Sequence, residues 1–273
     1  MTADFDFSGK TVFVAGGTSG INLGIAESFA DRGARLVVAS RSQDKVDAAV
    51  AKLRGHGADS YGFSADVRDF GRLAEAFAAA HETCGDIDVL ISGAAGNFPV
   101  YAENLSSNGF KTVVDIDLIG TFNVLKAAFS YLCRPGASVI NITAPQSEMV
   151  VSAQVHVCAA KAGIDQLTRV LALEWGKYGI RVNAISPGPI AGTEGMERLS
   201  PKSDSGHQAL LRSIPLGRMG LPSDIGNMAL FLSSPLGSYI TGAVIPVDGG
   251  WVLNGGAPLS RALQVLLAET TRS

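Results

Sequence analysis

A glycine-rich turn near the start of the chain carries the clearest chemical signal, and it reads Gly16-Gly17-Thr18-Ser19-Gly20-Ile21-Asn22-Leu23-Gly24. It follows a short β-branched run at 11–15 and opens an amphipathic stretch. Glycines let a backbone approach a pyrophosphate closely, and the free N–H groups at the start of the helix then stabilise its charge. Such a turn can be purely structural, but its place between a first strand and a first helix favours a dinucleotide site. The residues predicted to form it are Gly16, Thr18, Ser19, Gly20 and Ile21.

The end of the second predicted strand bears on which dinucleotide binds. NAD-specific proteins usually carry an acid there, which accepts from a ribose hydroxyl, whereas this chain reads Ala39-Ser40-Arg41. A guanidinium can instead pair with a ribose 2′-phosphate. Ser40 and Arg41 therefore favour NADP(H) over NAD(H), the alternative being an ordinary surface arginine. Asp66 and Val67 follow the third predicted strand, where an adenine edge would lie, although an aspartate there is also a common helix N-cap.

The elements that must position these residues alternate between short strands and longer helical patterns. Seven strands are predicted, at 11–15, 35–39, 60–64, 88–92, 138–142, 181–185 and 243–247. This alternation is typical of βαβ units around a parallel sheet. We therefore predict an α/β fold, a single Rossmann-like doubly wound domain over 1–273 with helices on both faces of a seven-stranded parallel sheet. Residues 192–215 lack a strand and are predicted to form a substrate lid, and 256–273 a helical C-terminal extension.

Composition narrows the possible partners. The 273 residues carry a net charge of −3 with the basic residues dispersed, which excludes a nucleic-acid or anionic-membrane surface and favours a small-molecule substrate. Apolar runs are only strand-length, the histidines are too dispersed for a metal site, and neither end resembles a targeting signal. The three cysteines, Cys84, Cys133 and Cys158, share no C-x-x-C spacing and suit a reducing compartment. We expect a cytoplasmic location.

Further motifs, in order along nearly the whole chain, resemble the short-chain dehydrogenase/reductase family. They are Ala65-Asp66-Val67, Ala94-Ala95-Gly96, Lys161 in a long helix, Pro187-Gly188-Pro189-Ile190 with Thr193, and Val247-Asp248-Gly249-Gly250. The resemblance implies a cofactor site that includes Ala94, Pro187 and Gly188. It also implies that Ile190 and Thr193 hold the nicotinamide carboxamide and that Lys161 binds the nicotinamide ribose.

The catalytic positions of that family are mostly changed. Its usual Tyr, Ser and Asn are replaced by Val157, Ala144 and Asp117, while Lys161 is kept. Reducing a ketone by hydride transfer needs a proton donor at the carbonyl oxygen, so ordinary carbonyl reduction is disfavoured. Local strings resemble instead the family's 2,4-dienoyl-CoA reductases, most closely the peroxisomal type, which show the same losses. These strings are Ala94-Ala95-Gly96-Asn97-Phe98, Phe110-Lys111-Thr112-Val113 with Asp115-Ile116-Asp117, Gln154-Val155-His156 and 187–195.

A 2,4-dienoyl thioester explains how a site can work without the tyrosine. Hydride can add at C5, because the negative charge then spreads into a dienolate and no alcohol has to form. The resemblance implies that Asp117 and Lys161, with an ordered water, handle the proton. It also implies an acyl-CoA site lined by Arg41, Phe98, Ser106, Asn108 and Arg198. Asp117 could instead orient a turn and Phe98 could cover core, whereas Lys161 stands on a small, apolar helix face that does not suit a solvated charge.

Two other functions stay open. The first is an alcohol or ketone dehydrogenase that recruits Tyr101 or His156 as a replacement acid, although helical geometry turns His156 about 100° away from Val157. The second is a dinucleotide-binding protein without turnover. The low charge, a mean hydropathy of +0.24 and an apolar helix at about 118–132 predict a homo-oligomer, and the resemblance implies a tetramer.

Two departures from the family pattern affect the cofactor turn itself. Asn22 replaces its third glycine, and could hydrogen-bond locally, weaken cofactor binding or contact an unusual substrate. Ser92-Gly93 replaces an asparagine pair at the end of the fourth strand, which removes a side chain that would brace the central strands.

Overall fold

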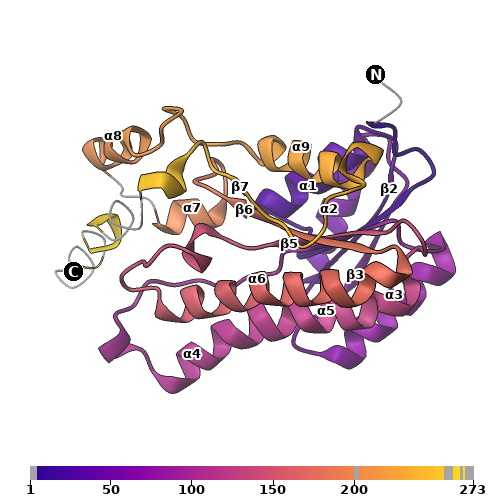
Figure 1. The fold of residues 1–273 in the computed structure, drawn as a ribbon, viewed down its shortest axis with the longest axis horizontal. Helices are drawn as coiled ribbons and strands as arrows, with labels where there is room; N and C mark the ends of the chain where they lie inside the picture. The colour runs from indigo at the N-terminus through magenta and orange to yellow at the C-terminus, as the bar shows by residue number, and fades with distance from the viewer. Residues whose placement is uncertain (1–4, 200–202, 255–260, 265–266, 268–273) are drawn as a thin grey trace.

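The computed structural model describes residues 5–199, 203–254, 261–264 and 267, and shows one α/β domain built on a seven-stranded sheet (Figure 1). The strand order is β3-β2-β1-β4-β5-β6-β7, and every neighbouring pair is parallel. The strands are β1 (Thr11–Ala15), β2 (Arg35–Ser40), β3 (Ser60–Ser64), β4 (Val89–Ser92), β5 (Ser138–Ile142), β6 (Arg181–Pro187) and β7 (Val244–Val247). All seven predicted strands are confirmed, three with the predicted bounds and four with one end shifted by one or two residues.

Helices cover both faces of the sheet. They are α1 (Gly20–Ala30), α2 (Gln43–Gly55), α3 (Phe70–Cys84), α4 (Ser107–Val114), α5 (Gly120–Ala128), α6 (Val155–Trp175), α7 (Glu194–Leu199), α8 (Asp204–Arg212) and α9 (Pro222–Ser233). Strand side chains alternate between the two layers, so Val12 and Val14 pack with α1, α2 and α9, whereas Phe13 packs with α3, α5 and α6. Because helices cover both faces, the central strands β1, β4 and β5 are buried along their whole length, whereas the edge strands β3 and β7 are partly exposed.

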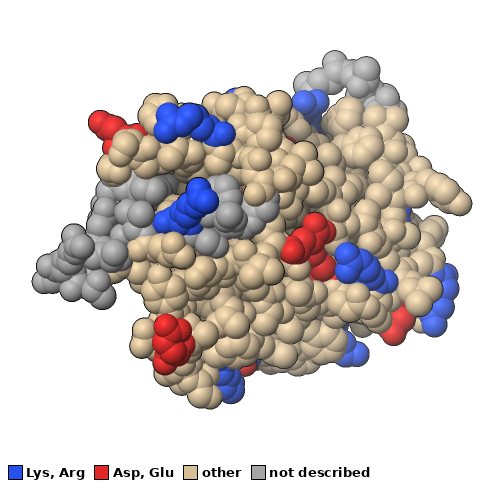
Figure 2. Space-filling model, turned by 60° about the vertical axis from the view of Figure 1, so that its left-hand side comes forward, with Lys and Arg blue, Asp and Glu red and all other residues tan. Residues whose placement is uncertain are grey.

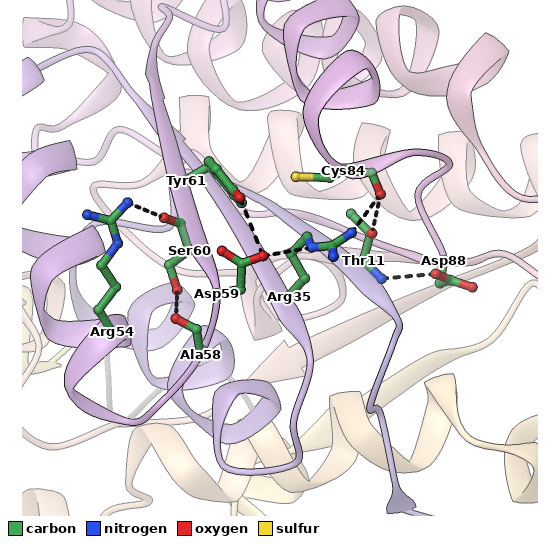
Figure 3. Close-up of polar contacts among 9 residues, drawn as sticks. All are labelled: Thr11, Arg35, Arg54, Ala58, Asp59, Ser60, Tyr61, Cys84 and Asp88. Atoms are coloured by element: carbon green, nitrogen blue, oxygen red, sulfur yellow. Dashed lines mark hydrogen bonds and ion pairs between the residues drawn. The ribbon is translucent and has the colours of Figure 1, made fainter.

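The amino ends of β1, β2 and β3 are tied together by polar contacts (Figure 3). Thr11 donates through its backbone N–H to Asp88 Oδ2 at 2.9 Å and through its hydroxyl to the Cys84 carbonyl at 3.0 Å. Arg35 reaches the same carbonyl at 3.1 Å and pairs with Asp59 at 3.0 Å. This edge of the sheet is therefore closed by the protein itself, which leaves the carboxyl edge as the place where a doubly wound sheet binds ligands.

The segment predicted as a lid contains α7 and α8 and no strand among its described residues. Of the predicted C-terminal extension, residues 261–264 and 267 are described and are helical, and the rest lies outside the described residues. No helix within the described ranges has both the length and the apolar character needed to cross a membrane. On the face drawn in Figure 2, basic and acidic side chains are scattered singly or in small groups.

Candidate active site

One cavity of about 580 Å³ lies at the carboxyl edge of the sheet and collects the residues predicted to bind the cofactor. All fifteen of them line it: Gly16, Thr18, Ser19, Gly20, Ile21, Ser40, Arg41, Asp66, Val67, Ala94, Lys161, Pro187, Gly188, Ile190 and Thr193. Asp117 lines the same cavity. The convergence follows from topology, because the turns after parallel strands meet at one edge, and the crevice opens where the chain order reverses between β1 and β4.

The turn after β1 has the geometry of an anion cradle. Gly16 and Gly20 adopt positive φ angles of 77° and 55°, which favour glycine. A Cβ on Gly16 would lie 2.9 Å from the backbone of Ala94, so the backbones approach closely here. Ser19 is the N-cap of α1, yet its side chain makes no capping hydrogen bond to the helix. The helix N-terminus can therefore offer N–H groups to a pyrophosphate, and the residues present fit a dinucleotide.

Cations gather at the far end of this cavity, beyond the end of β2. Arg41 is exposed there, and Lys45 in the first turns of α2 lines the cavity beside it. Asp66 lies at the same end, but it is occupied by Arg68, whose guanidinium reaches it at 2.6–3.2 Å. These hydrogen bonds hold the pKa of Asp66 below its usual range. This end of the cavity thus combines two cationic side chains with a carboxylate that is already paired.

Asp117 is placed by a π-helical turn, Asp115–Ile119, that interrupts the otherwise continuous helix from α4 to α5. The turn directs its carboxylate into the protein, where the residue is fully buried. One oxygen, Oδ1, accepts from the backbone N–H of Gly96 at 2.7 Å. Gly163 permits the close packing, because a Cβ there would lie 2.8 Å from Leu118 of the π-turn. Wide turns of this kind are frequent at functional sites.

Lys161 reaches the other carboxylate oxygen from α6. Its Nζ lies 3.3 Å from Asp117 Oδ2 and donates to the Ile142 carbonyl at 3.3 Å. Both side chains are almost entirely buried, at 7% and 1% exposed. An ammonium has three N–H donors and the Ile142 carbonyl accepts one of them, so donor capacity remains for a ligand in the cavity that Lys161 lines. A buried charge pair adds little net stability, so this pair suggests chemistry more than folding.

Comparisons with known proteins match most of the chain to members of one family. A family model described as Enoyl-(Acyl carrier protein) reductase matches residues 15–252. The solved structure of a short chain dehydrogenase from Bacillus anthracis is 37% identical in sequence and superposes with a TM-score of 0.82. The match covers 89% of this chain and 96% of that chain. The chain belongs to the short-chain dehydrogenase/reductase family.

Curated members of the family include several similar proteins. Two proteins named peroxisomal 2,4-dienoyl-CoA reductase [(3E)-enoyl-CoA-producing] are 45% identical over 244 residues in Rattus norvegicus and 41% over 252 residues in Arabidopsis thaliana. The alignment with the rat protein covers 88% of this chain and 83% of the rat protein, and the alignment with the Arabidopsis protein covers 89% of this chain and 84% of the Arabidopsis protein. A probable 2,4-dienoyl-CoA reductase [(2E)-enoyl-CoA-producing] of Bacillus subtilis is 38% identical over 248 residues, with 90% of this chain and 97% of that one covered.

Within this short-chain dehydrogenase/reductase site, no hydroxyl stands where the family's Ser and Tyr would be. Ala144 and Val157 both line the cavity at those positions. The two suggested replacement acids, Tyr101 and His156, are not among its described lining residues. His156 is fully buried, its ring packs 4.7 Å from that of Phe98, and burial lowers the pKa of its imidazole. Neither of the two side chains suggested as a replacement acid for an ordinary ketone reductase therefore reaches the described lining of this cavity.

The residues predicted to contact substrate are spread more widely. Arg41 lines the cavity, whereas Phe98, Ser106 and Asn108 do not. Ser106 caps α4 by accepting from the Gly109 N–H at 3.0 Å, and Phe98 packs over the same turn next to Gly109. Phe98, Ser106 and Asn108 thus form a group at the start of α4. Arg198 lies in α7, and its side chain is outside the described part of the structure.

The polar residues of the cavity that were missed from sequence include Lys45, Gln146 and Asn97. Lys45 carries a signal in hindsight, because it is a second cation just after the end of β2. Gln146, Gln154 and Asn97 form a chain of amides in which Gln146 donates to Gln154 at 3.1 Å and Gln154 donates to Asn97 at 3.0 Å. Gln146 and Asn97 line the cavity, and the fully buried Gln154 fixes both. No sequence spacing predicts such a chain.

Proposed function

We propose that this enzyme is an NADPH-dependent reductase of 2,4-dienoyl-CoA thioesters. The observation that carries the proposal is the buried Asp117–Lys161 pair in a cavity where Ala144 and Val157 take the places of the family's hydroxyl donors. The names of the similar proteins from rat, Arabidopsis and Bacillus subtilis support the substrate class. A conjugated thioester suits this site because its reduction ends on carbon, with no alkoxide to protonate.

The dinucleotide, when bound, supplies the hydride, and Gly16, Ser19, Gly20 and Ile21 would hold its pyrophosphate. Hydride adds at C5 of the dienoyl thioester, the electron pair spreads to the thioester oxygen, and a proton then adds at C2. The C3–C4 bond becomes the remaining double bond, so we propose a 3-enoyl product. Two relatives at 41–45% identity carry the (3E) product in their names.

Asp117 and Lys161 have separate parts in the protonation. The Lys161 ammonium stabilises negative charge in the cavity and can donate its free N–H to a water, and Asp117 holds that ammonium in place from 3.3 Å. Asp117 is itself fixed by the Gly96 N–H at 2.7 Å, so the pair is organised before the substrate binds. The proton at C2 is delivered from this pair through the water, and solvent restores it afterwards.

The proposed preference for NADPH rests on the cationic end of the cavity. Arg41 and Lys45 would face the 2′-phosphate, and Asp66 is engaged by Arg68. Removing one hydrogen-bonding cation from a phosphate costs about 1.5–3 kcal/mol, so Arg41→Ala should raise the Kd of NADPH about 10- to 150-fold. The Kd of NADH should change little, and equal changes for both cofactors would contradict the preference.

The test of function is a spectrophotometric assay with NADPH and 2,4-hexadienoyl-CoA. We expect loss of the nicotinamide absorbance with the dienoyl thioester, and little or none with saturated ketones. Lys161→Met and Asp117→Asn should abolish turnover. Tight NADPH binding without turnover of any thioester would refute the proposal and favour a non-catalytic dinucleotide-binding protein.

We also propose that the enzyme is a homotetramer. Four apolar side chains on the π-turn, α5 and α6, those of Ile119, Phe122, Val170 and Leu173, are 41–84% exposed. Apolar surface of this kind is typical of subunit contacts. Light scattering should give about four times the chain mass of 28.3 kDa, and Phe122→Lys should lower it. If light scattering gives the mass of a single chain even at high protein concentration, the proposed tetramer is refuted.

The three free cysteines fit a reducing compartment, for which we propose the cytoplasm. Two of the relatives carry the word peroxisomal in their names, so fractionation should compare both compartments.

A further inference from the structure

Asn22 and Gly93 make an unusual contact in the floor of the cavity. Asn22 lies in the first turn of α1, where the family pattern has a glycine, and Gly93 directly follows β4. The Asn22 amide donates to the Gly93 carbonyl at 2.8 Å and to the Gly16 carbonyl at 3.3 Å. One side chain thus joins the turn after β1 to the turn after β4, across the point where the strand order reverses.

The fit between these two residues is close. A Cβ on Gly93 would lie 2.3–2.6 Å from three atoms of the Asn22 amide, which real structures do not tolerate. The amide therefore occupies the space in which any other residue at position 93 would carry its side chain. The two departures noted in the sequence are one arrangement, in which the bracing amide comes from α1 and the end of β4 gives up its side chain.

The position of the amide gives it electrostatic consequences. Gly16, Asn22 and Gly93 all line the cavity, beside the turn suited to a pyrophosphate. Two backbone carbonyls oriented toward this region would repel phosphate oxygens through the negative ends of their dipoles. The Asn22 N–H groups satisfy both carbonyls and keep the two turns at a fixed separation.

We propose that Asn22 is a positioning residue for the dinucleotide, and that Gly93 is the partner it requires. The inference rests on the proposed dinucleotide function but not on the identity of the substrate. It acts through the shape and charge of the cavity floor, away from the 2′-phosphate end. Its loss therefore weakens NADPH and NADH by the same factor.

The test is a double-mutant cycle read out by equilibrium binding of NADPH and NADH to the full chain. Asn22→Ala removes two hydrogen bonds and should raise both Kd values about tenfold, while Asn227→Ala, on an exposed face of α9, leaves them unchanged. Gly93→Ala should weaken binding strongly in the parent and less than about threefold in the Asn22→Ala background. The free energy of unfolding in urea, measured for the same variants without cofactor, shows that each variant folds. We expect these free energies to show the same coupling between positions 22 and 93.

A further variant separates positioning of the cofactor from general support of the fold. Asn22→Asp keeps the shape, removes the donors and adds a negative charge next to the pyrophosphate. The ratio of its NADPH Kd to that of the parent should grow as the salt concentration falls, because screening weakens. A ratio independent of salt, additive effects in the cycle, or unchanged binding by Asn22→Ala would each overturn the proposal. If the parent binds neither dinucleotide, the proposed function itself fails.

Discussion

Replacing Lys161 by methionine tests the buried pair most directly. Lys161 and Asp117 are 93% and 99% shielded from solvent, and their charged atoms lie 3.3 Å apart. Lys161→Met preserves the length of the side chain but removes the cation, and the Asp117 carboxylate then keeps its hydrogen bond from the Gly96 N–H. Removing one partner of a buried ion pair costs about 3–5 kcal/mol, because the other charge is left uncompensated. At about 2–4 °C per kcal/mol, the midpoint of thermal unfolding should fall by about 6–20 °C.

Two variants control this experiment. Lys177→Met makes the same change at an exposed lysine just after α6 and should leave the unfolding midpoint within about 1 °C, as surface substitutions usually do. Asp117→Asn/Lys161→Met removes both charges while an amide oxygen can still accept from Gly96, so it should be more stable than Lys161→Met alone. If Lys161→Met unfolds at the parent's temperature, or the second change restores nothing, the two groups are not paired in the folded protein.

Three further predictions follow from single sites. Gly188→Ala should lower the free energy of unfolding in urea by about 1–3 kcal/mol, because the added Cβ would lie 2.6 Å from the Asp248 backbone. Gly195→Ala is the control, since a Cβ there would have nothing within 4 Å, and it should not destabilise the protein. Burial lowers the pKa of His156, so the unfolded chain binds a proton at this residue before the folded chain does, and the free energy of unfolding falls as the pH drops below about 6.5. This contribution is worth up to about 1.4 kcal/mol per pH unit. Unfolding measured at pH about 7.5 and about 5.5 should show it in the parent but not in His156→Leu. Burial, with Asp88 nearby, raises the pKa of the Cys133 thiol from 9.0 to about 11. Alkylation of Cys133 at pH about 8 should therefore be about 100-fold slower in the folded protein than in the unfolded chain. Equal rates would refute the burial of this thiol.

The sequence was sufficient for the fold and the cofactor cavity because both depend on periodic features. Strands buried on both faces are apolar runs, and the turns after parallel strands meet at one edge. For this reason residues as distant as Ser19, Arg41 and Gly188 could be assigned to one cavity before the structure was known. The substrate residues depended on loop conformations, and there Phe98, Ser106 and Asn108 group at the start of α4, outside the cavity lining.

The π-turn was not predictable from its residues. Asp115-Ile116-Asp117-Leu118-Ile119 has an ordinary helical composition, and a regular helix through it would give Asp117 a different direction. What selects the wider turn is packing from elsewhere in the chain, because Gly163 of α6 makes room for Leu118 and Gly120 lies against Val67. Local propensity does not contain such contacts, so the direction of a helical side chain at a bulge has to come from the structure.

The Asn22–Gly93 contact shows how a pattern comparison can misjudge a site by taking positions singly. At position 22 a side chain appears where the backbone should be bare, and at position 93 a bracing side chain is missing, so each change alone indicates a weakened cavity. In space the changes offset each other, since the amide of Asn22 lies where a Cβ of Gly93 would be and hydrogen-bonds to its carbonyl at 2.8 Å. The same reasoning applies to the catalytic positions. Ala144 and Val157 each indicate a loss when taken alone, but beside a buried ammonium and carboxylate they agree with the proposed substrate, which takes its proton on carbon.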